Sequence, residues 1–274
     1  MDNVATLKIR KNEPFLRWAG GKRWFVDKYS DFLEPFDGKY VEPFLGSGAV
    51  FFHLRPKKAT IADANVDLIT TYLEIQKNPE LVEVAINVLK RSEMDYYQIR
   101  AWTPVETYNI AARFIYLNRT CWNGLWRVNK KGKFNVPQGS KNIHQYPDDD
   151  FSEISEILKK ARIRNWDFKK TIGTAREGDF LFADPPYTVR HNFNGFVKYN
   201  EEIFSWKNQQ ELSRSLIKAV ERGVKVMCTN ANHESVRKLY PNSHFEKTPV
   251  KRYSSISSKT STRSSYQELI IKSK

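Results

Sequence analysis

Short apolar runs alternate with amphipathic stretches along most of the chain. Stretches such as 67–76 and 209–223 repeat apolar positions at helical spacing, and Gly223 closes the second. Strands that alternate with helices predict a mostly parallel sheet covered on both faces, a Rossmann-like α/β fold. The last two apolar runs have no helical stretch between them and predict an antiparallel edge. The expected strands are 39–44, 59–64, 161–167, 179–186, 224–230, 244–250 and 267–273.

The segment from 66 to 147 breaks this alternation. It is helical at first and then becomes aromatic and basic, and no Asp or Glu occurs between 107 and 147. We interpret it as a mainly helical domain inserted into the sheet domain, which would comprise 1–65 and 148–274. The residues on either side of the turn 129–132 predict a β-hairpin within the insertion.

Composition favours a globular protein that binds nucleic acid. The 274 residues are 40% hydrophobic, which allows a sizeable core, and the formal net charge of +14 predicts attraction to a polyanion. An acidic membrane is the competing partner, but the chain has no apolar run of about 18 residues. The N-terminal residues lack a signal-peptide core, and Cys121 and Cys228 are too few for a disulfide framework. Both observations favour a reducing cytoplasm.

One expected buried strand ends in an unusual sequence, Asp184-Pro185-Pro186-Tyr187. The prolines restrict the backbone so that the Pro185 carbonyl and the Asp184 carboxylate can both point outward as hydrogen-bond acceptors. Two acceptors suit an exocyclic amino group, and Tyr187 offers a face on which a planar base can stack. A strand-ending turn without a ligand is the alternative interpretation.

A glycine-containing turn follows the first expected strand. The strand ends at Glu42, and Gly46 and Gly48 allow a tight turn into a helix, which is how doubly wound sheets receive nucleotide-like cofactors. The next strand ends at Asp63, whose carboxylate would reach the hydroxyls of a ribose. A turn without a ligand explains the glycines equally simply, and Asp63 is also a candidate helix cap.

The N-terminal motif FLRWAGGKRW combines small, aromatic and basic residues. Gly20 and Gly21 permit close approach of the backbone, Trp18 offers a flat surface, and Lys22 can pair with a ligand carboxylate. The alternative is a glycine turn that leads into a helix, with Trp18 in the core.

The expected hairpin presents residues suited to reading DNA near its start, namely Trp122, Asn123, Leu125 and Arg127. Arg and Asn read base edges in the major groove, and a bulky side chain can wedge into a base stack. One of Trp122 and Trp126 is instead expected in the core. The lysines of the turn, including Lys131, suit phosphate contacts or a solvated turn.

The residue pattern does not predict a metal site or a serine nucleophile. The five histidines show no metal-ligand spacing with one another, so we expect no metal site. A G-x-S-x-G serine nucleophile motif is absent as well.

Five motifs together resemble the Dam-like DNA adenine-N6 methyltransferases of the alpha class. In order they are FLRWAGGKRW, VEPFLGSGAVFF, IADANVDLI, the block NRTCWNGLWRVNKKGKFNVPQG, and ADPPY. The resemblance implies S-adenosylmethionine as the cofactor, with Trp18, Lys22, Asp63 and Asp184 in contact with it. Glu42, Gly46, Asp167 and Phe168 would lie nearby, the last two beside the cofactor's adenine.

The resemblance also implies double-stranded DNA as the substrate, with the insertion 66–147 as the target-recognition domain. Arg127 would be the main base reader, and the segment 251–265 is similar to a DNA-contacting segment of the family. The target GATC is a hypothesis, because Trp122 stands where the family usually has Tyr or Phe. The expected DNA-binding residues are Arg119, Trp122, Asn123, Leu125, Arg127, Lys131, Arg252 and Arg263.

These observations predict an enzyme that methylates adenine N6 in a base flipped out of the duplex. We expect Asp184 and the Pro185 carbonyl to accept hydrogen bonds from the two amino N–H groups and Tyr187 to stack on the base, with neither a covalent intermediate nor a metal. We expect it in the cytoplasm of a bacterial or phage-infected cell, without an obligatory protein partner. An RNA amino-methyltransferase and a catalytically idle DNA-binding protein remain as alternatives.

Overall fold

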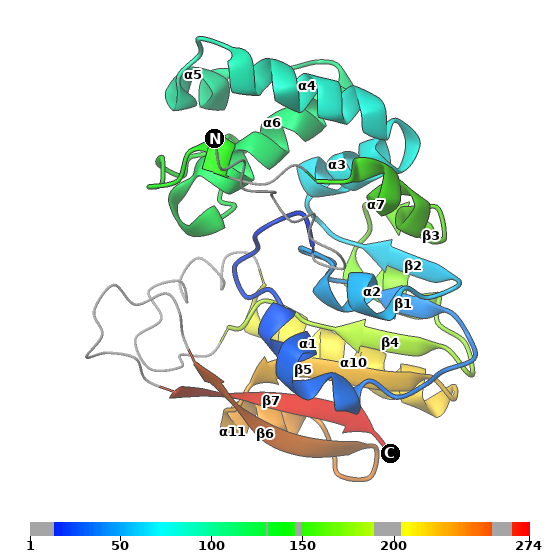
Figure 1. The fold of residues 1–274 in the computed structure, drawn as a ribbon. Helices are drawn as coiled ribbons and strands as arrows, with labels where there is room; N and C mark the ends of the chain where they lie inside the picture. Colours follow the sequence, from blue (N-terminus) through cyan, green and yellow to red (C-terminus); the bar gives the residue numbers. More distant parts are fainter. Residues whose placement is uncertain (1–13, 130, 146–148, 189–203, 254–264) are drawn as a thin grey trace, which may run out of the picture. The chain divides into compact units, whose positions relative to one another are not determined.

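The computed structural model describes residues 14–129, 131–145, 149–188, 204–253 and 265–274 (Figure 1). These residues form an α/β fold around a seven-stranded sheet. The strands are β1 (Tyr40–Glu42), β2 (Ala59–Ala62), β3 (Ala161–Arg164), β4 (Phe180–Ala183), β5 (Lys225–Ala231), β6 (Phe245–Tyr253) and β7 (Ser265–Ser273). The α-helices are α1 (Arg23–Tyr29), α2 (Ala49–Leu54), α3 (Val66–Lys77), α4 (Pro79–Arg91), α5 (Tyr96–Ala101), α6 (Thr107–Thr120), α7 (Phe151–Leu158), α8 (Phe168–Gly173), α10 (Trp206–Glu221) and α11 (Glu234–Leu239). Short 3-10 helices are η1 (Ser30–Phe32), η2 (Trp122–Gly124) and η3 (Ile143–Gln145).

The strand order β3-β2-β1-β4-β5-β7-β6 is that of a doubly wound sheet with an antiparallel edge. Strand β1 pairs in parallel with β2 and β4, and β4 pairs in parallel with β5. Strand β7 is antiparallel to both β5 and β6. The fold class predicted from the alternation of runs is therefore confirmed, and each expected strand position holds a strand.

Burial explains why the central strands read as continuous apolar runs. All four residues of β4 are buried, as are all three of β1, because helices cover both faces of a parallel sheet. Helix α10 packs on α8 and β5 through an apolar stripe that includes Leu212 and Leu216. Ser205 caps this helix by accepting a hydrogen bond from the Asn208 amide, and Gly223, with φ +78°, follows its end as expected.

The residues divide into two compact units by their contacts. The first unit is Met1–Val26, Gly46–Arg55 and Asn65–Ile163, and the second unit is Asp27–Leu45, Pro56–Ala64 and Arg164–Lys274. The expected insertion lies within the first unit, where α3, α4 and α6 pack against one another (Figure 1). This unit also takes in the N-terminal segment and α2, so its extent differs from the boundaries expected from the sequence.

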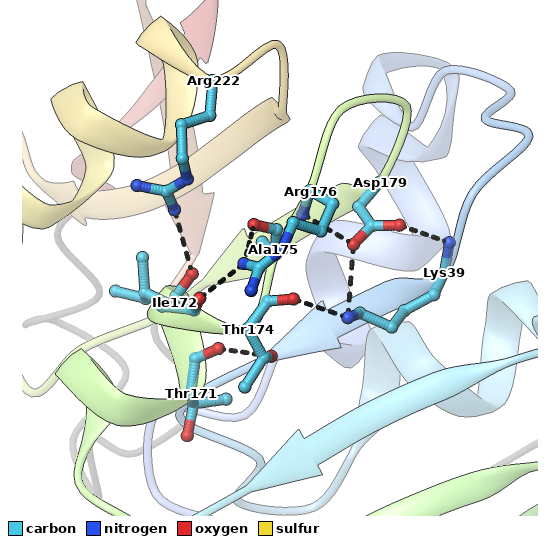
Figure 2. Close-up of polar contacts among 9 residues, drawn as sticks. Lys39, Thr171, Ile172, Thr174, Ala175, Arg176, Asp179 and Arg222 are labelled. Carbon is cyan, nitrogen blue, oxygen red and sulfur yellow. Dashed lines mark hydrogen bonds and ion pairs between the residues drawn. The ribbon is translucent and has the colours of Figure 1, made fainter.

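A buried carboxylate ties together the segments that lead into β1 and β4. Asp179 Oδ1 accepts a hydrogen bond from the Lys39 amide at 2.8 Å, and Asp179 Oδ2 accepts one from the Arg176 amide at 2.9 Å (Figure 2). Lys39 Nζ lies 3.4 Å from Asp179 Oδ2 and donates to the Thr174 carbonyl at 2.7 Å. Gly38 is required here, because a Cβ at that position would lie 2.6 Å from Asp179 Oδ1. These bonds align the starts of two adjacent parallel strands.

Candidate active site

Three carboxylates of the second unit follow or end neighbouring parallel strands. Glu42 ends β1, Asp63 follows β2, and Asp184 follows β4. Strand β1 lies between β2 and β4, and the carboxyl ends of parallel strands meet at one edge of the sheet. This edge is where open α/β sheets bind their ligands.

Asp184 is held in place from the neighbouring strand. The β4–β5 register pairs Ala183 with Cys228, which places Thr229 next to Asp184. Asp184 Oδ1 accepts a hydrogen bond of 2.7 Å from Thr229 Oγ1, and the Tyr187 hydroxyl lies 3.4 Å from the same oxygen. The carboxylate therefore has a defined orientation before any ligand is present.

The backbone after Asp184 is fixed by two buried side-chain amides, those of Gln209 and Asn230. Gln209 Nε2 on α10 donates to the Pro186 carbonyl at 3.0 Å, and Gln209 Oε1 accepts from Asn230 Nδ2 at 3.0 Å. Both amide side chains belong to fully buried residues, so these bonds are shielded from water. The Asp-Pro-Pro-Tyr turn thus rests on two elements, α10 and β5.

Tyr187 is only partly buried, but its hydroxyl points into the protein. Its hydroxyl donates to Glu268 Oε2 on β7 at 2.7 Å, and Arg252 Nη1 donates to Glu268 Oε1 at 2.7 Å. Burial raises the pKa of the Tyr187 hydroxyl well above its ordinary value, and the neighbouring Glu268 and Asp184 carboxylates act in the same direction. The hydroxyl is therefore a neutral hydrogen-bond donor at neutral pH.

Glu42 is an almost fully buried carboxyl, with 3% of its surface exposed. Within the part of the chain that the structure describes, its Oε2 atom has no hydrogen-bond partner. Burial raises the pKa of Glu42 well above its ordinary value near 4.5, and the carboxylates of Asp184 and Asp63 also raise this pKa, whereas the nearby Tyr40 hydroxyl opposes the shift. A buried acceptor at this edge suits a polar or cationic ligand group.

The raised pKa of Glu42 predicts a pH-dependent stability. Between the ordinary and the raised pKa the folded chain binds more protons than the unfolded chain, so the free energy of unfolding falls as the pH rises through this window. Glu42→Gln removes this titration, and we expect it to flatten the fall of the free energy of unfolding at pH values above the ordinary carboxyl pKa near 4.5, as measured by urea unfolding. Parallel pH profiles for the variant and the parent chain would show that Glu42 is ionised in the folded state.

Asp63, Asp167 and Phe168 complete the set expected in the second unit. The Asp63 carbonyl accepts a hydrogen bond from Asn165 Nδ2 at 2.9 Å, and helix α3 is capped by Asn65, which removes the helix-cap alternative for Asp63. Asp167 is exposed and caps α8 by accepting from the Lys169 amide at 2.8 Å. Phe168 is buried and stacks on the Phe44 ring at a centroid distance of 5.6 Å.

The glycine turn of the first unit packs against Trp18. Gly46 has φ +49°, and a Cβ there would lie 2.7 Å from Trp18 Cδ1, so only glycine fits. Gly48, with φ +66°, is the N-cap of α2, and Tyr72 donates to the Gly46 carbonyl at 3.1 Å. Trp18 is partly buried and stacks on Phe114. The turn thus presents backbone groups at the start of a helix.

Lys22 is buried although it carries an ammonium group, with 4% of its surface exposed. Its Nζ atom donates to the Gly20 carbonyl at 3.0 Å and lies 6.0 Å from the centre of the Trp24 ring. Gly20 has φ +81°, which explains the glycine at that position. The WAGGK motif therefore forms a tight turn around its own lysine.

The expected hairpin is present in the first unit. Isolated antiparallel bridges join Cys121 to Gln138 and Val128 to Phe134, and the Gly132 amide donates to the Asn129 carbonyl across the turn. Lys130, in the middle of that turn, lies outside the described residues. The ladder is short and interrupted, so its tip rests on few backbone bonds.

The two tryptophans of the hairpin differ in burial, as expected. Trp126 packs between Phe114 and Phe134, with ring centroids 3.9 and 4.6 Å away, whereas Trp122 is 52% exposed. Asn123 beside it is exposed and has φ +54°, an uncommon backbone conformation for a residue other than glycine.

Arg127 and its neighbours have distinct environments on the hairpin. Arg127 Nε donates to Asn135 Oδ1 at 2.8 Å, which holds the side chain against the opposite arm. Leu125 is partly buried, and Lys131 is exposed at the turn. Arg127 is thus oriented by the protein, whereas Lys131 extends into solvent.

Two of the arginines expected to bind DNA form ion pairs within the protein. Arg119 is 3% exposed, donates to the Phe15 carbonyl and pairs with Asp149, a position that favours packing of the first unit over DNA contact. Arg252 is partly buried and pairs with Glu268. Arg263 lies in the segment 254–264, which the structure does not describe.

Sequence reasoning missed Thr229, Gln209 and Glu268, the partners of the Asp-Pro-Pro-Tyr turn. Two signals were available. Thr229 and Asn230 are polar residues at the end of a buried strand, and Glu268 directly precedes the apolar run 269–271 of β7. Polar residues at such positions have to be satisfied by hydrogen bonds, which marks them as candidates for a site.

The described ranges contain neither a cluster of metal ligands nor a membrane-spanning helix. No group of three or more His, Cys, Asp or Glu residues there could hold a metal ion. None of the helices that the structure describes is long and apolar enough to cross a membrane.

The doubly wound sheet carries carboxylates at the carboxyl ends of adjacent parallel strands, the edge at which open α/β sheets bind their ligands. Residues 18–256 match the model of the D12 class N6 adenine-specific DNA methyltransferases, and the chain belongs to this family of enzymes.

Curated relatives span nearly the whole chain. A type II methyltransferase of Lactococcus lactis subsp. cremoris is 34% identical over 281 residues, covering 96% of this chain and 97% of that protein. The DNA adenine methylase of Haemophilus influenzae is 31% identical, covering 95% of this chain and 93% of that protein. The DNA adenine methylase of Escherichia coli is 30% identical, covering 96% and 95% respectively. The expected family is thereby confirmed.

Proposed function

We propose that this enzyme transfers a methyl group from S-adenosylmethionine to N6 of an adenine that is flipped out of duplex DNA. The observation that carries the proposal is the Asp184 carboxylate, oriented by Thr229 beside the partly buried ring of Tyr187. A rigid acceptor next to an aromatic face suits a planar base with an amino group.

The residues at the strand ends fit the cofactor. Gly46 is restricted to glycine by its contact with Trp18, and Gly48 leads into α2. Glu42 offers a buried acceptor without a partner at Oε2 among the described residues. We assign Glu42, Gly46, Asp63 and Asp184 to cofactor binding on this basis. When bound, S-adenosylmethionine supplies an electrophilic methyl group.

The family resemblance extends this set to four more residues. Phe168, which is buried and follows β3, is assigned to the cofactor's adenine on this resemblance. Asp167 caps the same helix. Trp18 and Lys22 of the WAGGK motif are assigned on the resemblance of that motif.

The base would be held by groups of the Asp-Pro-Pro-Tyr turn. Asp184 and the Pro185 carbonyl accept hydrogen bonds from the two N6–H groups, which orients the nitrogen lone pair and raises its electron density. Pro186 restricts the backbone, and Tyr187 stacks on the base. Taking the base out of the duplex costs a few kcal/mol, which these contacts have to offset.

DNA would be contacted through the hairpin of the first unit. Trp122 and Asn123 are exposed and suited to filling the gap left by the flipped base, and Leu125 lies beside them. Arg127 is assigned to base reading and Lys131 to phosphate contact. Region 66–147 would then act as the target-recognition domain, with GATC as the first target to test.

A labelled-methyl assay tests the proposal. Duplexes with GATC intact or disrupted, and a single-stranded RNA, are incubated with the enzyme and labelled S-adenosylmethionine. We expect label in duplex DNA only when GATC is intact. Label in other duplexes would keep the chemistry and reject the target, label in RNA alone would reject DNA as substrate, and binding of DNA without label would leave an idle DNA-binding protein.

A further inference from the structure

Tyr187 is tied to a strand that lies far away in the sequence. Its hydroxyl donates to Glu268 Oε2 at 2.7 Å, and the two residues are 81 positions apart. Glu268 belongs to β7 and is 3% exposed. Strand β7 pairs with β5 as well as β6, so the acceptor of this bond sits inside the sheet. The tyrosine is therefore anchored to a rigid element rather than to its own loop.

Arg252 makes this buried acceptor possible. Its Nη1 atom donates to Glu268 Oε1 at 2.7 Å, and the side chains are 23% and 4% exposed. The β6–β7 register pairs Arg252 with Tyr266 and Val250 with Glu268, which makes Arg252 and Glu268 diagonal neighbours on the antiparallel ladder. A buried carboxylate needs such a paired cation, because an unpaired buried charge is costly.

The bond from the Tyr187 hydroxyl to Glu268 restricts the orientation of the aromatic ring. The hydroxyl is enclosed and remains protonated at neutral pH, because burial raises its pKa, so it serves as a donor and not as an acid or base. The residue as a whole is only partly buried. Fixing the tip of an aromatic side chain limits rotation about its χ angles and hence the tilt of the ring.

We propose that Glu268, supported by Arg252, is a positioning residue that sets the orientation of the Tyr187 ring against the target base. The proposal rests on the function proposed above, in which Tyr187 stacks on the flipped adenine. A ring that tilts lets the adenine rotate away from Asp184, and a small misplacement of reacting groups lowers the transfer rate strongly. Arg252 then acts through the protein and not as a DNA contact.

A double-mutant cycle tests this network. Tyr187→Phe, Glu268→Gln and the double variant are compared in single-turnover methyl transfer at saturating cofactor and duplex. We expect each single change to slow transfer about tenfold, the effect of losing one charge-assisted hydrogen bond, while the affinity for duplex changes by less than about twofold. The double variant should be no slower than the slower of the two single variants, because Glu268→Gln weakens the same bond that Tyr187→Phe removes.

A fluorescent base gives a readout that a merely structural role would not move. A duplex with 2-aminopurine at the target position reports stacking on Tyr187 through quenching of its emission. We expect the emission of the bound duplex to rise in Glu268→Gln, since a loosened ring stacks less completely. Unchanged emission together with an unchanged transfer rate would overturn the proposal.

Asp179→Asn is the matched control. Asp179 is another buried carboxylate of the same sheet, bonded at the start of β4 and outside the proposed machinery (Figure 2). It should lower the free energy of unfolding without changing the transfer rate or 2-aminopurine emission of the folded enzyme. If Glu268→Gln does not fold, Arg252→Gln replaces it in the cycle, with the same coupling to Tyr187→Phe expected.

The outcomes separate this inference from the proposed function. Transfer by the parent enzyme with additive effects of Tyr187→Phe and Glu268→Gln would overturn the inference alone. A parent enzyme that methylates no duplex would overturn both. General weakening of DNA binding by Arg252→Gln, with the transfer rate of the bound complex unchanged, would return Arg252 to the DNA contacts and also reject the inference.

Discussion

Asp184→Ala is expected to abolish methyl transfer while leaving the fold intact. The change removes an acceptor that Thr229 orients with a hydrogen bond of 2.7 Å, and in our proposal this acceptor acts directly on the amino group of the target adenine. Losing one preorganised group that acts in the transition state typically costs about 10²–10³-fold in rate. We expect at least this loss in single-turnover transfer of labelled methyl, with only a small change in the affinity for duplex DNA.

Two further variants sharpen the result for Asp184. Asp184→Asn keeps the shape of the side chain but loses its charge and one acceptor, so it should also transfer methyl slowly. Thr229→Val leaves the carboxylate in place and removes only the bond that orients it, so its effect should be smaller. Turnover by Asp184→Ala within about tenfold of the parent enzyme would refute the assigned role.

Arg127→Ala is expected to lose the choice of target sequence. The Arg127 side chain is held against the opposite arm of the hairpin by its bond to Asn135, so it presents a preorganised fork of donors. A good bidentate contact to a base contributes about 1–3 kcal/mol of discrimination against the wrong base. Rates on intact and disrupted GATC duplexes should therefore converge in this variant.

Lys131→Ala is the matched comparison for Arg127. This exposed lysine should weaken binding to all sequences equally and lower the salt slope of the affinity by about 1. Asn135→Ala should give a milder form of the Arg127 effect, because it frees the side chain without removing it. Equal loss of affinity for all duplexes in Arg127→Ala would make Arg127 a phosphate contact.

The strand positions and two of the turns could be predicted from neighbouring residues in the sequence. The apolar runs indicated the strands, because the residues of β4 are buried throughout and all apolar, and the turn after β4 stood out because aspartate and proline end such a run. Gly46 stood out for a similar reason, since two glycines after a strand allow a tight turn into a helix. These features depend on neighbouring residues and are visible along the chain.

The ion-pair partners of charged residues could not be predicted from neighbouring residues in the sequence. Arg119 and Arg252 have the residue type of DNA contacts, yet they pair with Asp149 and Glu268. Whether an arginine faces solvent depends on which acidic residue folding brings beside it. The sequence order says little about this, because the partners of these two arginines lie 30 and 16 positions away.

By itself, the sequence determined the family, the alternation of strands and helices, and the motif that ends β4, because hydrophobic period and turn chemistry are local properties. Only the tertiary structure decided what supports that motif. Thr229 reaches Asp184 through the register of β4 and β5, and Glu268 reaches Tyr187 because β7 pairs beside β5. Strand order and register are set by packing of the whole sheet, so residues from distant segments became the neighbours of the site.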